Sequence, residues 1–478
     1  MRLRHATVAP MGAIGPDWAP RYFSDVPPPW ALDQVAAAFL RECRVHSAPL
    51  QQLATVRAAL RRGAIARAAL ELRGHLDGLT AGADDVALLC RAVDDACAGV
   101  SLDVDGADQR HAAALRCRIA AELLDTVVGA RLVTCLANRL DASTAVAPGQ
   151  PYPRVRPRLT DLFSGRLTTR PDRQDEFPID HLPSLAIADD SDVQLRFDFS
   201  LSPLLPIPTR GTLLAGVFPI SGVVDDGGDD EAMQVRRPVG DELRFVVEPV
   251  NPGHNERALL RLLAAADAQG CTIAIVPELC VGGGAVVAAR RWLADHAASL
   301  ELVACGSAHH DEGGRRYNRS TVLIRERDGR RVKAFHHDKF NPFGYGQAGN
   351  DAEPIYEAID CPVANVTSWV RLGAATPGEP SRALWSYAAL ICKDLFRERV
   401  DAALQRARVG LLLVPAMSER LVTFEQIAMG TARTQTITVI ANQDPTEIGL
   451  VVVQPVEGAG LRTWSRPRSG IEVIVLCD

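Results

Sequence analysis

The chain has 478 residues, of which 47% are hydrophobic and 23% charged, and its formal net charge is −6. This length predicts two or three domains of a folded globular protein, not a disordered or fibrous chain. The slight acidic excess excludes nucleic-acid binding through bulk positive charge, and no apolar run approaches the roughly 20 residues that span a bilayer, so neither nucleic acid nor a membrane is an expected partner.

Residues 1–147 are predicted to form a mainly helical N-terminal domain. Pro10 and Pro16 interrupt any signal-peptide core at its start, so we expect a cytoplasmic protein. Apolar residues recur at three-to-four spacing over residues 56–72, 84–98 and 108–140, which is the helical pattern. No catalytic constellation occurs there. The expected role is docking, either of a protein partner or of the second half of the chain.

Residues 148–241 are predicted to be a proline-rich linker or irregular segment. Ten of the 31 prolines fall within residues 148–208, and proline disrupts both helices and central strands. A short strand at residues 193–199 is compatible with this segment. The next domain is therefore expected to begin near residue 242.

Residues 242–478 alternate between apolar strands and amphipathic helices. Strands are predicted at residues 243–247 and 271–276, with a helix at 255–268 between them, which is a unit of the α/β type. Further strands are predicted at 302–305, 320–324, 388–392, 410–414, 436–441 and 449–454, and helices at 285–298 and after residue 425. Several strands are continuously apolar, as in sheets covered on both faces.

The eleven cysteines are scattered and form no Cys-x-x-Cys pair. This pattern is typical of a reducing cytoplasm and argues against disulfide frameworks and structural zinc. The sequence also lacks a phosphate-binding lysine loop, a dinucleotide glycine fingerprint and metal-ligand spacing. We therefore expect an activity that needs neither a cofactor nor a metal.

Three reactive side chains follow predicted strands. Glu278 comes after the strand at residues 271–276, Lys339 follows the strand-like residues 331–335, and Cys392 ends the strand at 388–392. Ligands of α/β sheets gather at the carboxyl ends of the strands, so these three side chains are expected to converge.

The chain contains only three lysines among its 52 basic residues, Lys333, Lys339 and Lys393. Lysine is a compact charge with a tunable pKa, whereas arginine is not, so a lysine in an arginine-rich chain is informative. Lys333 is a rival for the functional position, but its place within a strand makes it the weaker candidate.

A carboxylate, an ammonium and a thiol together suit the cleavage of a carbon–nitrogen bond without metal. The carboxylate accepts the thiol proton as general base and later returns a proton to the leaving amine. The ammonium favours the thiolate and stabilises the oxyanion of a tetrahedral intermediate. The cysteine then carries the acyl group as a thioester.

At these residues the second half of the chain, about residues 242–478, resembles the nitrilase, or carbon–nitrogen hydrolase, superfamily. The matching segments are Val-Val-Glu-Pro-Val-Asn-Pro at 246–252, Pro-Glu-Leu at 277–279, Asn-Pro-Phe-Gly at 341–344 and Leu-Ile-Cys-Lys-Asp at 390–394. The resemblance implies an α-β-β-α sandwich, a homo-oligomer, and a catalytic triad of Glu278 as base, Lys339 as stabiliser of the intermediate and Cys392 as nucleophile.

The chain departs from the family pattern after the lysine, where many members carry a second glutamate in a Phe-Gly-Glu context. Here Tyr345 follows Gly344, and both Gln347 and Glu353 stay open as replacements. Asp394 is expected to hydrogen-bond the backbone near the nucleophile. His336 and His337 are expected to have a polar role in a loop.

The leading interpretation is an amidase-type hydrolase of a non-peptide carbon–nitrogen bond, with a small amide or nitrile as substrate. Glutaminase or nitrilase activity is an alternative within the same family. A different class of function stays open, in which the second half is a catalytically weak scaffold and the helical domain mediates assembly. The reactivity of Cys392 separates an enzyme from a scaffold.

Overall fold

The structure is a computed structural model of the chain. It describes residues 6–7, 29–45, 64–76, 80–98, 101–102, 109–140, 145–153, 182, 184–188, 192–201, 212–218, 224–225, 233–238, 240–241, 243–326, 331–345, 354–372, 383–432, 436–444, 447–456, 459–465 and 470–476. The chain divides into two compact units. Unit 1 comprises Met1–Arg154, Thr169–Ser191 and Gly373–Ala383, and unit 2 comprises Val155–Thr168, Asp192–Leu372 and Leu384–Asp478.

The described part of unit 1 is mainly helical. Its helices are α2 (Leu32–Val45), α5 (Ala64–Leu72), α6 (Ala83–Cys97) and α7 (Gln109–Arg139). Three short strand pairs accompany them: β1 (Ala6–Thr7) with β4 (Ser101–Leu102), β2 (Trp30–Ala31) with β3 (Thr80–Ala81), and β5 (Pro151–Pro153) with β6 (Leu185–Ile187). The apolar faces of the helices share one core of buried leucine, alanine, valine and cysteine side chains.

Unit 2 contains two large sheets. The six-stranded sheet has the order β15-β14-β13-β12-β8-β24. Its strands are β8 (Thr212–Val217), β12 (Ile273–Ile275), β13 (Leu302–Glu312), β14 (Arg315–Arg325), β15 (Val332–Asp338) and β24 (Ile471–Leu476). The seven-stranded sheet has the order β23-β22-β21-β20-β19-β18-β7. Its strands are β7 (Gln194–Asp198), β18 (Asn365–Leu372), β19 (Ala383–Ala389), β20 (Leu411–Ala416), β21 (Ile437–Asp444), β22 (Glu447–Val456) and β23 (Ala459–Ser465).

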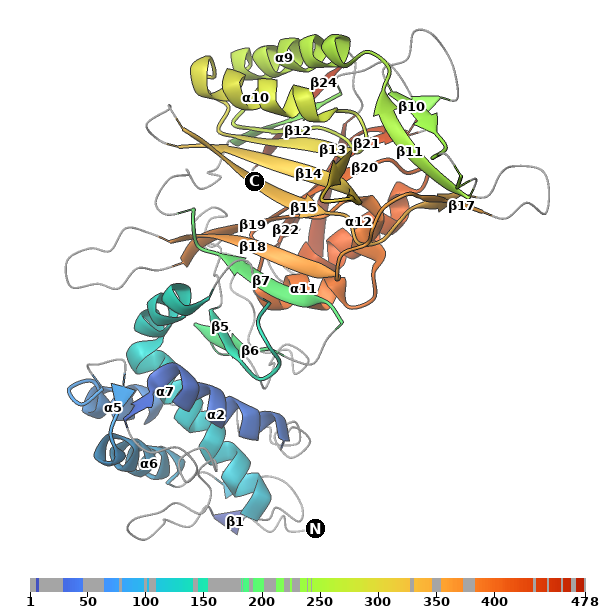
Figure 1. Cartoon of the computed structure of the whole chain (residues 1–478). Helices are drawn as coiled ribbons and strands as arrows, with labels where there is room; N and C mark the ends of the chain where they lie inside the picture. Colours follow the sequence, from blue (N-terminus) through green and yellow to red (C-terminus); the bar gives the residue numbers. More distant parts are fainter. Residues whose placement is uncertain are drawn as a thin grey trace. The chain divides into compact units, whose positions relative to one another are not determined.

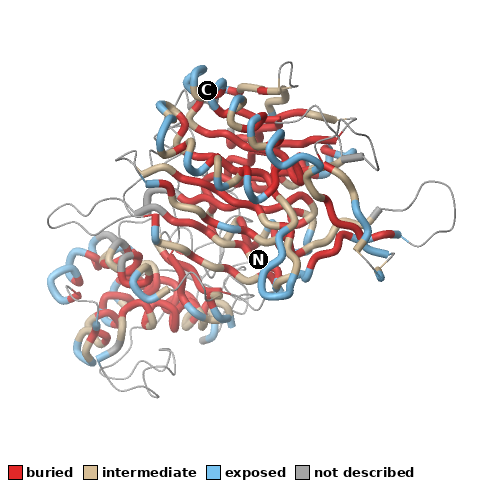
Figure 2. The backbone as a smooth tube through the Cα atoms, turned by 45° about the horizontal axis from the view of Figure 1, so that its top comes forward, coloured by how far each residue is buried: buried red, intermediate tan, exposed pale blue. Residues whose placement is uncertain are grey.

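The two sheets share an apolar core, and helices cover their outer faces. Leu214, Ile275 and Val322 of the first sheet belong to the same buried cluster as Leu413 and Val439 of the second. Helices α9 (Pro252–Ala268) and α10 (Gly283–Asp295) pack on the outside of the six-stranded sheet. Helices α11 (Val400–Ala407) and α12 (Leu421–Ala432) contact strands of the seven-stranded sheet. Unit 2 is therefore an α-β-β-α sandwich (Figure 1), and its central strands are buried (Figure 2).

A smaller sheet extends unit 2, with the order β16-β17-β11-β10-β9. Its strands are β9 (Val224–Asp225), β10 (Met233–Arg236), β11 (Arg244–Pro249), β16 (Gly344–Tyr345) and β17 (Ile355–Glu357). The 3-10 helix η2 (Cys392–Phe396) follows strand β19.

The α/β class predicted from the sequence is confirmed. Strands β12 and β20 are short, apolar and buried throughout, as expected for strands covered on both faces. The sandwich also includes β7 and β8, which lie before residue 242, where we expected it to begin. Strand β8 joins because Leu214 and Ala215 are apolar and pair with β12 despite the nearby prolines. Among the described residues, no helix is long and apolar enough to cross a membrane.

Gly306 gives a test of how the sandwich is built. It has a φ of +55° at an irregularity in the pairing of β13 with β14, and a Cβ there would lie 2.1 Å from the carbonyl oxygen of Pro277. A residue with a Cβ in this backbone conformation costs about 1–3 kcal/mol. Gly306→Ala should therefore lower the free energy of unfolding of unit 2 by that amount or more. Gly284→Ala is the matched control, because nothing lies within 4 Å of a Cβ at that helical position.

The measurement is the midpoint of thermal unfolding of the purified chain. The Gly306 variant should lose several degrees, while the Gly284 variant should stay unchanged or gain slightly. Equal midpoints for the two variants would contradict this explanation of the β13 irregularity.

Candidate active site

Glu278, Lys339 and Cys392 meet at one end of the unit 2 sandwich. Glu278 follows β12, Lys339 follows β15, and Cys392 is the first residue of η2. All three are almost fully buried, with 2%, 1% and 2% exposure. Nζ of Lys339 lies 2.7 Å from Oε1 of Glu278, and the charges of Glu278 and Lys339 both act on the Cys392 thiol, where they shift its pKa in opposite directions. The structure therefore brings together the three residues that the sequence predicted would converge.

Local backbone geometry aims the Glu278 side chain. The next residue, Leu279, has a φ of +54°, in the left-handed region that favours glycine. Its backbone N–H donates to Oγ of Ser307 at 3.2 Å. A strained residue next to a buried carboxylate persists only where the surroundings over-determine it.

Cys392 stands on a comparable turn. Its φ is +46°, and its sulfur lies 3.8 Å from the carbonyl oxygen of Met417. The turn occurs where strand β19 gives way to the 3-10 helix η2. This places a thiol at the carboxyl end of a strand, where the sheet leaves room for a ligand.

Glu357 is a fourth ionisable member of the site, and sequence reasoning missed it. Its Oε2 lies 2.6 Å from Nζ of Lys339 and accepts the backbone N–H of Phe343 at 3.0 Å. It ends strand β17, 18 positions after Lys339. The sequence feature that could have identified Glu357 is an acidic residue in the middle of an apolar run, between Ile355 and Ile359. Gln347 and Glu353, the replacements left open, lie outside the described residues.

Asn318 and His309 complete the polar cluster, and neither was singled out from the sequence. Nδ2 of Asn318 donates to Oε1 of Glu278 at 3.1 Å and to Oε1 of Glu357 at 2.6 Å. The backbone carbonyl of Asn318 accepts the N–H of Lys339 at 2.8 Å. Nε2 of His309 lies 3.4 Å from Oε1 of Glu357. One buried amide thus holds both carboxylates and the lysine in register.

The two carboxylates have opposite electrostatic environments. Burial raises the pKa of Glu278, and the negative charge of Glu357 adds to this, while the Lys339 ammonium opposes it. Burial alone would also raise the pKa of Glu357, but Lys339 and His309 lower it below its ordinary value. Burial disfavours the Lys339 ammonium, yet the two carboxylates raise its pKa well above the ordinary value. Carboxyl groups with divergent pKa values take different roles, with Glu278 suited to proton transfer and Glu357 to holding charge.

The nucleophile differs from the sequence expectation. We expected the lysine to favour the thiolate, but burial raises the pKa of the Cys392 thiol well above its ordinary value. Glu278 raises this pKa further, and Lys339 only partly opposes the two effects. The resting sulfur is therefore a neutral thiol, and any attack requires a base that removes its proton as the new bond forms.

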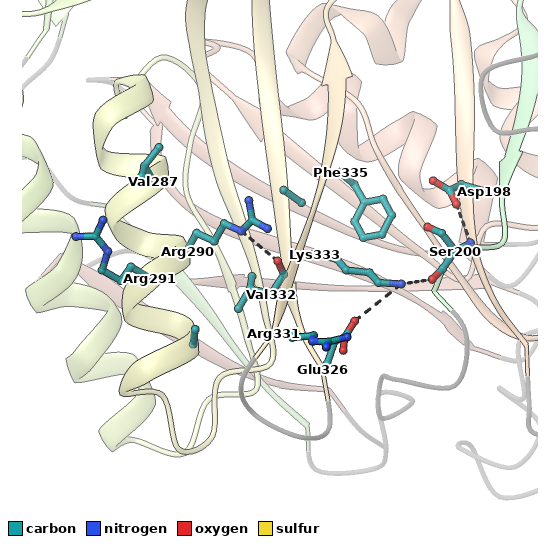
Figure 3. Close-up of a pocket in the computed structure, with 12 residues that line it drawn as sticks. Asp198, Ser200, Val287, Arg290, Arg291, Glu326, Arg331, Val332, Lys333 and Phe335 are labelled. Carbon is teal, nitrogen blue, oxygen red and sulfur yellow. Dashed lines mark hydrogen bonds and ion pairs between the residues drawn. The ribbon is translucent and has the colours of Figure 1, made fainter.

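Lys333, the rival lysine, lies elsewhere. It lines a groove of about 850 Å³ between α10 and β15, where Figure 3 shows its ammonium directed at Ser200 and Glu326. Nζ of Lys333 donates to the carbonyl oxygen of Ser200 and lies 4.0 Å from Oε1 of Glu326. None of the residues that line this groove belongs to the cluster around Lys339. Within the described part of the chain, no group of three or more His, Cys, Asp or Glu side chains is arranged to hold a metal ion.

No protein-family model and no curated protein matches the chain. Among solved structures, it is similar to a glutamine-dependent NAD(+) synthetase from Cytophaga hutchinsonii, with 13% identity and a TM-score of 0.31 over 55% of this chain. The match covers 42% of that enzyme, so the chain spans less than half of its length. A mutant of an amidase from Nesterenkonia AN1, described as a member of the nitrilase superfamily, matches with 19% identity and a TM-score of 0.36, covering 57% of this chain and 94% of the amidase. An amidase from Nesterenkonia sp. matches with 16% identity and a TM-score of 0.35, covering 58% and 93%.

Proposed function

We propose that the chain is a hydrolase of a non-peptide carbon–nitrogen bond, of the amidase type, in the nitrilase superfamily. The observation that carries the proposal is the buried contact of Lys339 with both Glu278 and Glu357, beside a Cys392 thiol whose pKa both Lys339 and Glu278 shift. This arrangement supplies a nucleophile, a base and a fixed positive charge in one buried cluster.

In the proposed reaction, Cys392 attacks the carbonyl carbon of an amide while Glu278 takes the thiol proton. Lys339 stabilises the oxyanion that forms. The carbon–nitrogen bond then breaks, the protonated Glu278 gives its proton to the leaving amine, and the acyl group stays on sulfur as a thioester. Glu278 next takes a proton from water, whose oxygen attacks the thioester. The carbon–sulfur bond then breaks, Glu278 returns the proton to the sulfur, and a carboxylic acid and the free thiol result. Glu357 keeps its negative charge throughout and holds Lys339 protonated.

Glutaminase and nitrilase activity use the same three residues and are outcomes of the same substrate test. The absence of a second glutamate directly after Gly344 would favour the scaffold alternative. The carboxylate of Glu357, 2.6 Å from Nζ of Lys339, argues against it. The small amide or nitrile substrate, the homo-oligomer, the protein partner of residues 1–147 and the cytoplasmic location stay predictions.

Glu278→Gln should separate thiol reactivity from catalysis. Because the Glu278 charge raises the pKa of the Cys392 thiol, its removal should lower that pKa and speed the alkylation of Cys392 by iodoacetamide at pH 7. Hydrolysis of amides should nevertheless fall by about 100-fold or more, because the general base is lost. Lys339→Met should have the opposite effect on alkylation, since the ammonium is what lowers the thiol pKa.

The measurement is peptide mass spectrometry of Cys392 alkylation over a pH series, beside hydrolysis of short aliphatic amides, glutamine and aliphatic nitriles. The other cysteines serve as internal references, and Glu312→Gln is the control because Glu312 is an exposed carboxylate on the β13–β14 hairpin. A wild-type chain that hydrolyses none of these compounds, together with a Glu278→Gln variant that leaves Cys392 alkylation unchanged, would support the scaffold interpretation instead.

Glu357→Gln should change the pH dependence of catalysis. Glu357 raises the pKa of Glu278, so its removal should lower that pKa. The acidic limb of kcat/KM reports the deprotonation of the base, so this limb should move to lower pH. The rate itself should fall about 10- to 100-fold because Lys339 loses one of its two anchors. An acidic limb that coincides with that of the wild type would refute the assignment of separate roles to the two glutamates.

A further inference from the structure

One buried carboxylate outside the catalytic cluster gathers donors from two parts of the chain. Oδ1 of Asp394 accepts the backbone N–H groups of Phe340 at 3.0 Å and Asn341 at 2.8 Å. Oδ2 accepts Nε2–H of His337 at 2.8 Å and the N–H of Ile391 at 3.3 Å. The exposure of Asp394 is 0% and that of His337 is 3%. Burial of a carboxylate this deep is unfavourable unless donors satisfy both of its oxygens, as they do here.

The donors belong to the two segments that carry the proposed catalytic groups. His337 and Asn341 each lie two residues from Lys339, and Asp394 lies two residues after Cys392. A second bond ties the same segments, because Nδ2 of Asn341 donates to the carbonyl oxygen of Lys393 at 2.7 Å. The contact therefore links the end of β15 directly to the turn that bears the thiol.

His337 is held in one orientation by its surroundings. Its ring packs edge-on against Phe340, with 5.8 Å between the ring centroids. Because the Asp394 oxygen can only accept, the proton of the bond lies on Nε2 of His337. Among the described residues, the charged group that pairs with His337 is Asp394 of η2, whereas Glu278 and Glu357 each pair with Lys339.

We propose that Asp394 and His337 are a pair of positioning residues, which set the separation between Nζ of Lys339 and Sγ of Cys392. The inference rests on the proposed function, because this separation matters only if the two groups act together. Neither side chain transfers a proton in the reaction. Their effect is geometric, and a displacement of about 1 Å between reacting groups can cost about 100-fold in rate.

Loss of the Asp394–His337 contact should change the reactivity of Cys392, which loss of a merely structural contact would not. The groups that face the Cys392 sulfur are the Glu278 carboxylate, the Lys339 ammonium and the Met417 carbonyl oxygen. If the β15 end moves away from the Cys392 turn, the Lys339 ammonium moves with it. The ammonium then lowers the thiol pKa less, and the raising effect of Glu278 is opposed less. The alkylation profile of Cys392 should then move to higher pH, and kcat should fall while KM changes little.

His337→Phe tests the pair, and His336→Phe is a matched control on the same strand. Nδ1 of His336 lies 3.0 Å from Oγ1 of Thr321, and the adjacent position places its side chain on the other face of β15. His337→Gln restores a donor for Asp394 and is the rescue variant. Each full-length variant is alkylated with iodoacetamide over a pH series, with Cys392 read by peptide mass spectrometry and the thermal midpoint recorded in parallel.

His337→Phe is expected to slow Cys392 alkylation at pH 7 by about ten-fold and to move its pH midpoint upwards. His337→Gln should recover to within about two-fold of the wild type, and His336→Phe should match it. A folded His337→Phe variant with the wild-type profile would overturn the proposal. Equal slowing in the His336 and His337 variants would also overturn it, because the effect would then belong to the strand as a whole.

Asp394→Asn tests the proposed pair if the His337→Phe variant does not fold. The amide oxygen of the new side chain still accepts the N–H groups of Phe340 and Asn341. Its amide nitrogen stands where Oδ2 of Asp394 accepted the proton of His337, so that hydrogen bond is lost. A smaller upward shift of the Cys392 profile supports the pair, and an unchanged profile overturns it. The wild type separates this outcome from failure of the proposed function: unselective Cys392 labelling with no hydrolysis in the wild type would contradict the hydrolase itself.

Discussion

The site depends on one ammonium buried between two carboxylates. Lys339 is 1% exposed, and without Glu278 and Glu357 its charge would be unfavourable at that depth. The attraction holds only because the fold delivers the three side chains from separate strands to one point. Each carboxylate also receives the Asn318 amide, so the geometry is over-determined rather than left to a single ion pair. The protein thus keeps a protonated lysine where water is excluded, which is where an oxyanion is stabilised most strongly.

The backbone around the cluster is strained at several positions. Leu279 and Cys392 both have left-handed φ values, and Gly306 approaches the Pro277 carbonyl where no larger residue fits. Leu279 and Cys392 lie in the turns that follow β12 and β19, and Gly306 lies at a pairing irregularity between β13 and β14. Strain of this kind gathers at functional sites because regular strands cannot point several side chains at one spot.

Much of unit 2 could be predicted from the sequence, and the reason is visible in particular residues. Glu278 and Cys392 each follow a continuously apolar strand, and Lys339 follows a strand-like run in an arginine-rich chain. Glu357 and Asn318 could not be found this way, because neither follows a predicted strand: Glu357 is placed by the pairing of β17 with the distant β11, and Asn318 lies within β14, opposite His309 of β13. Strand β8 was hidden by the prolines around it, since its role comes from pairing with β12, which local sequence does not encode.

The four members of the cluster and a bound substrate together keep a constant total charge in the proposed reaction. The resting site holds two carboxylates, one ammonium and a neutral thiol, which leaves one net negative charge. When the thiol proton moves to Glu278 and the oxyanion forms, one negative charge disappears and another appears, and the total is unchanged. A buried cluster can therefore complete the step by shifting charge over a few ångströms. Little reorganisation of the distant solvent is required, so the acylation rate should be nearly insensitive to ionic strength.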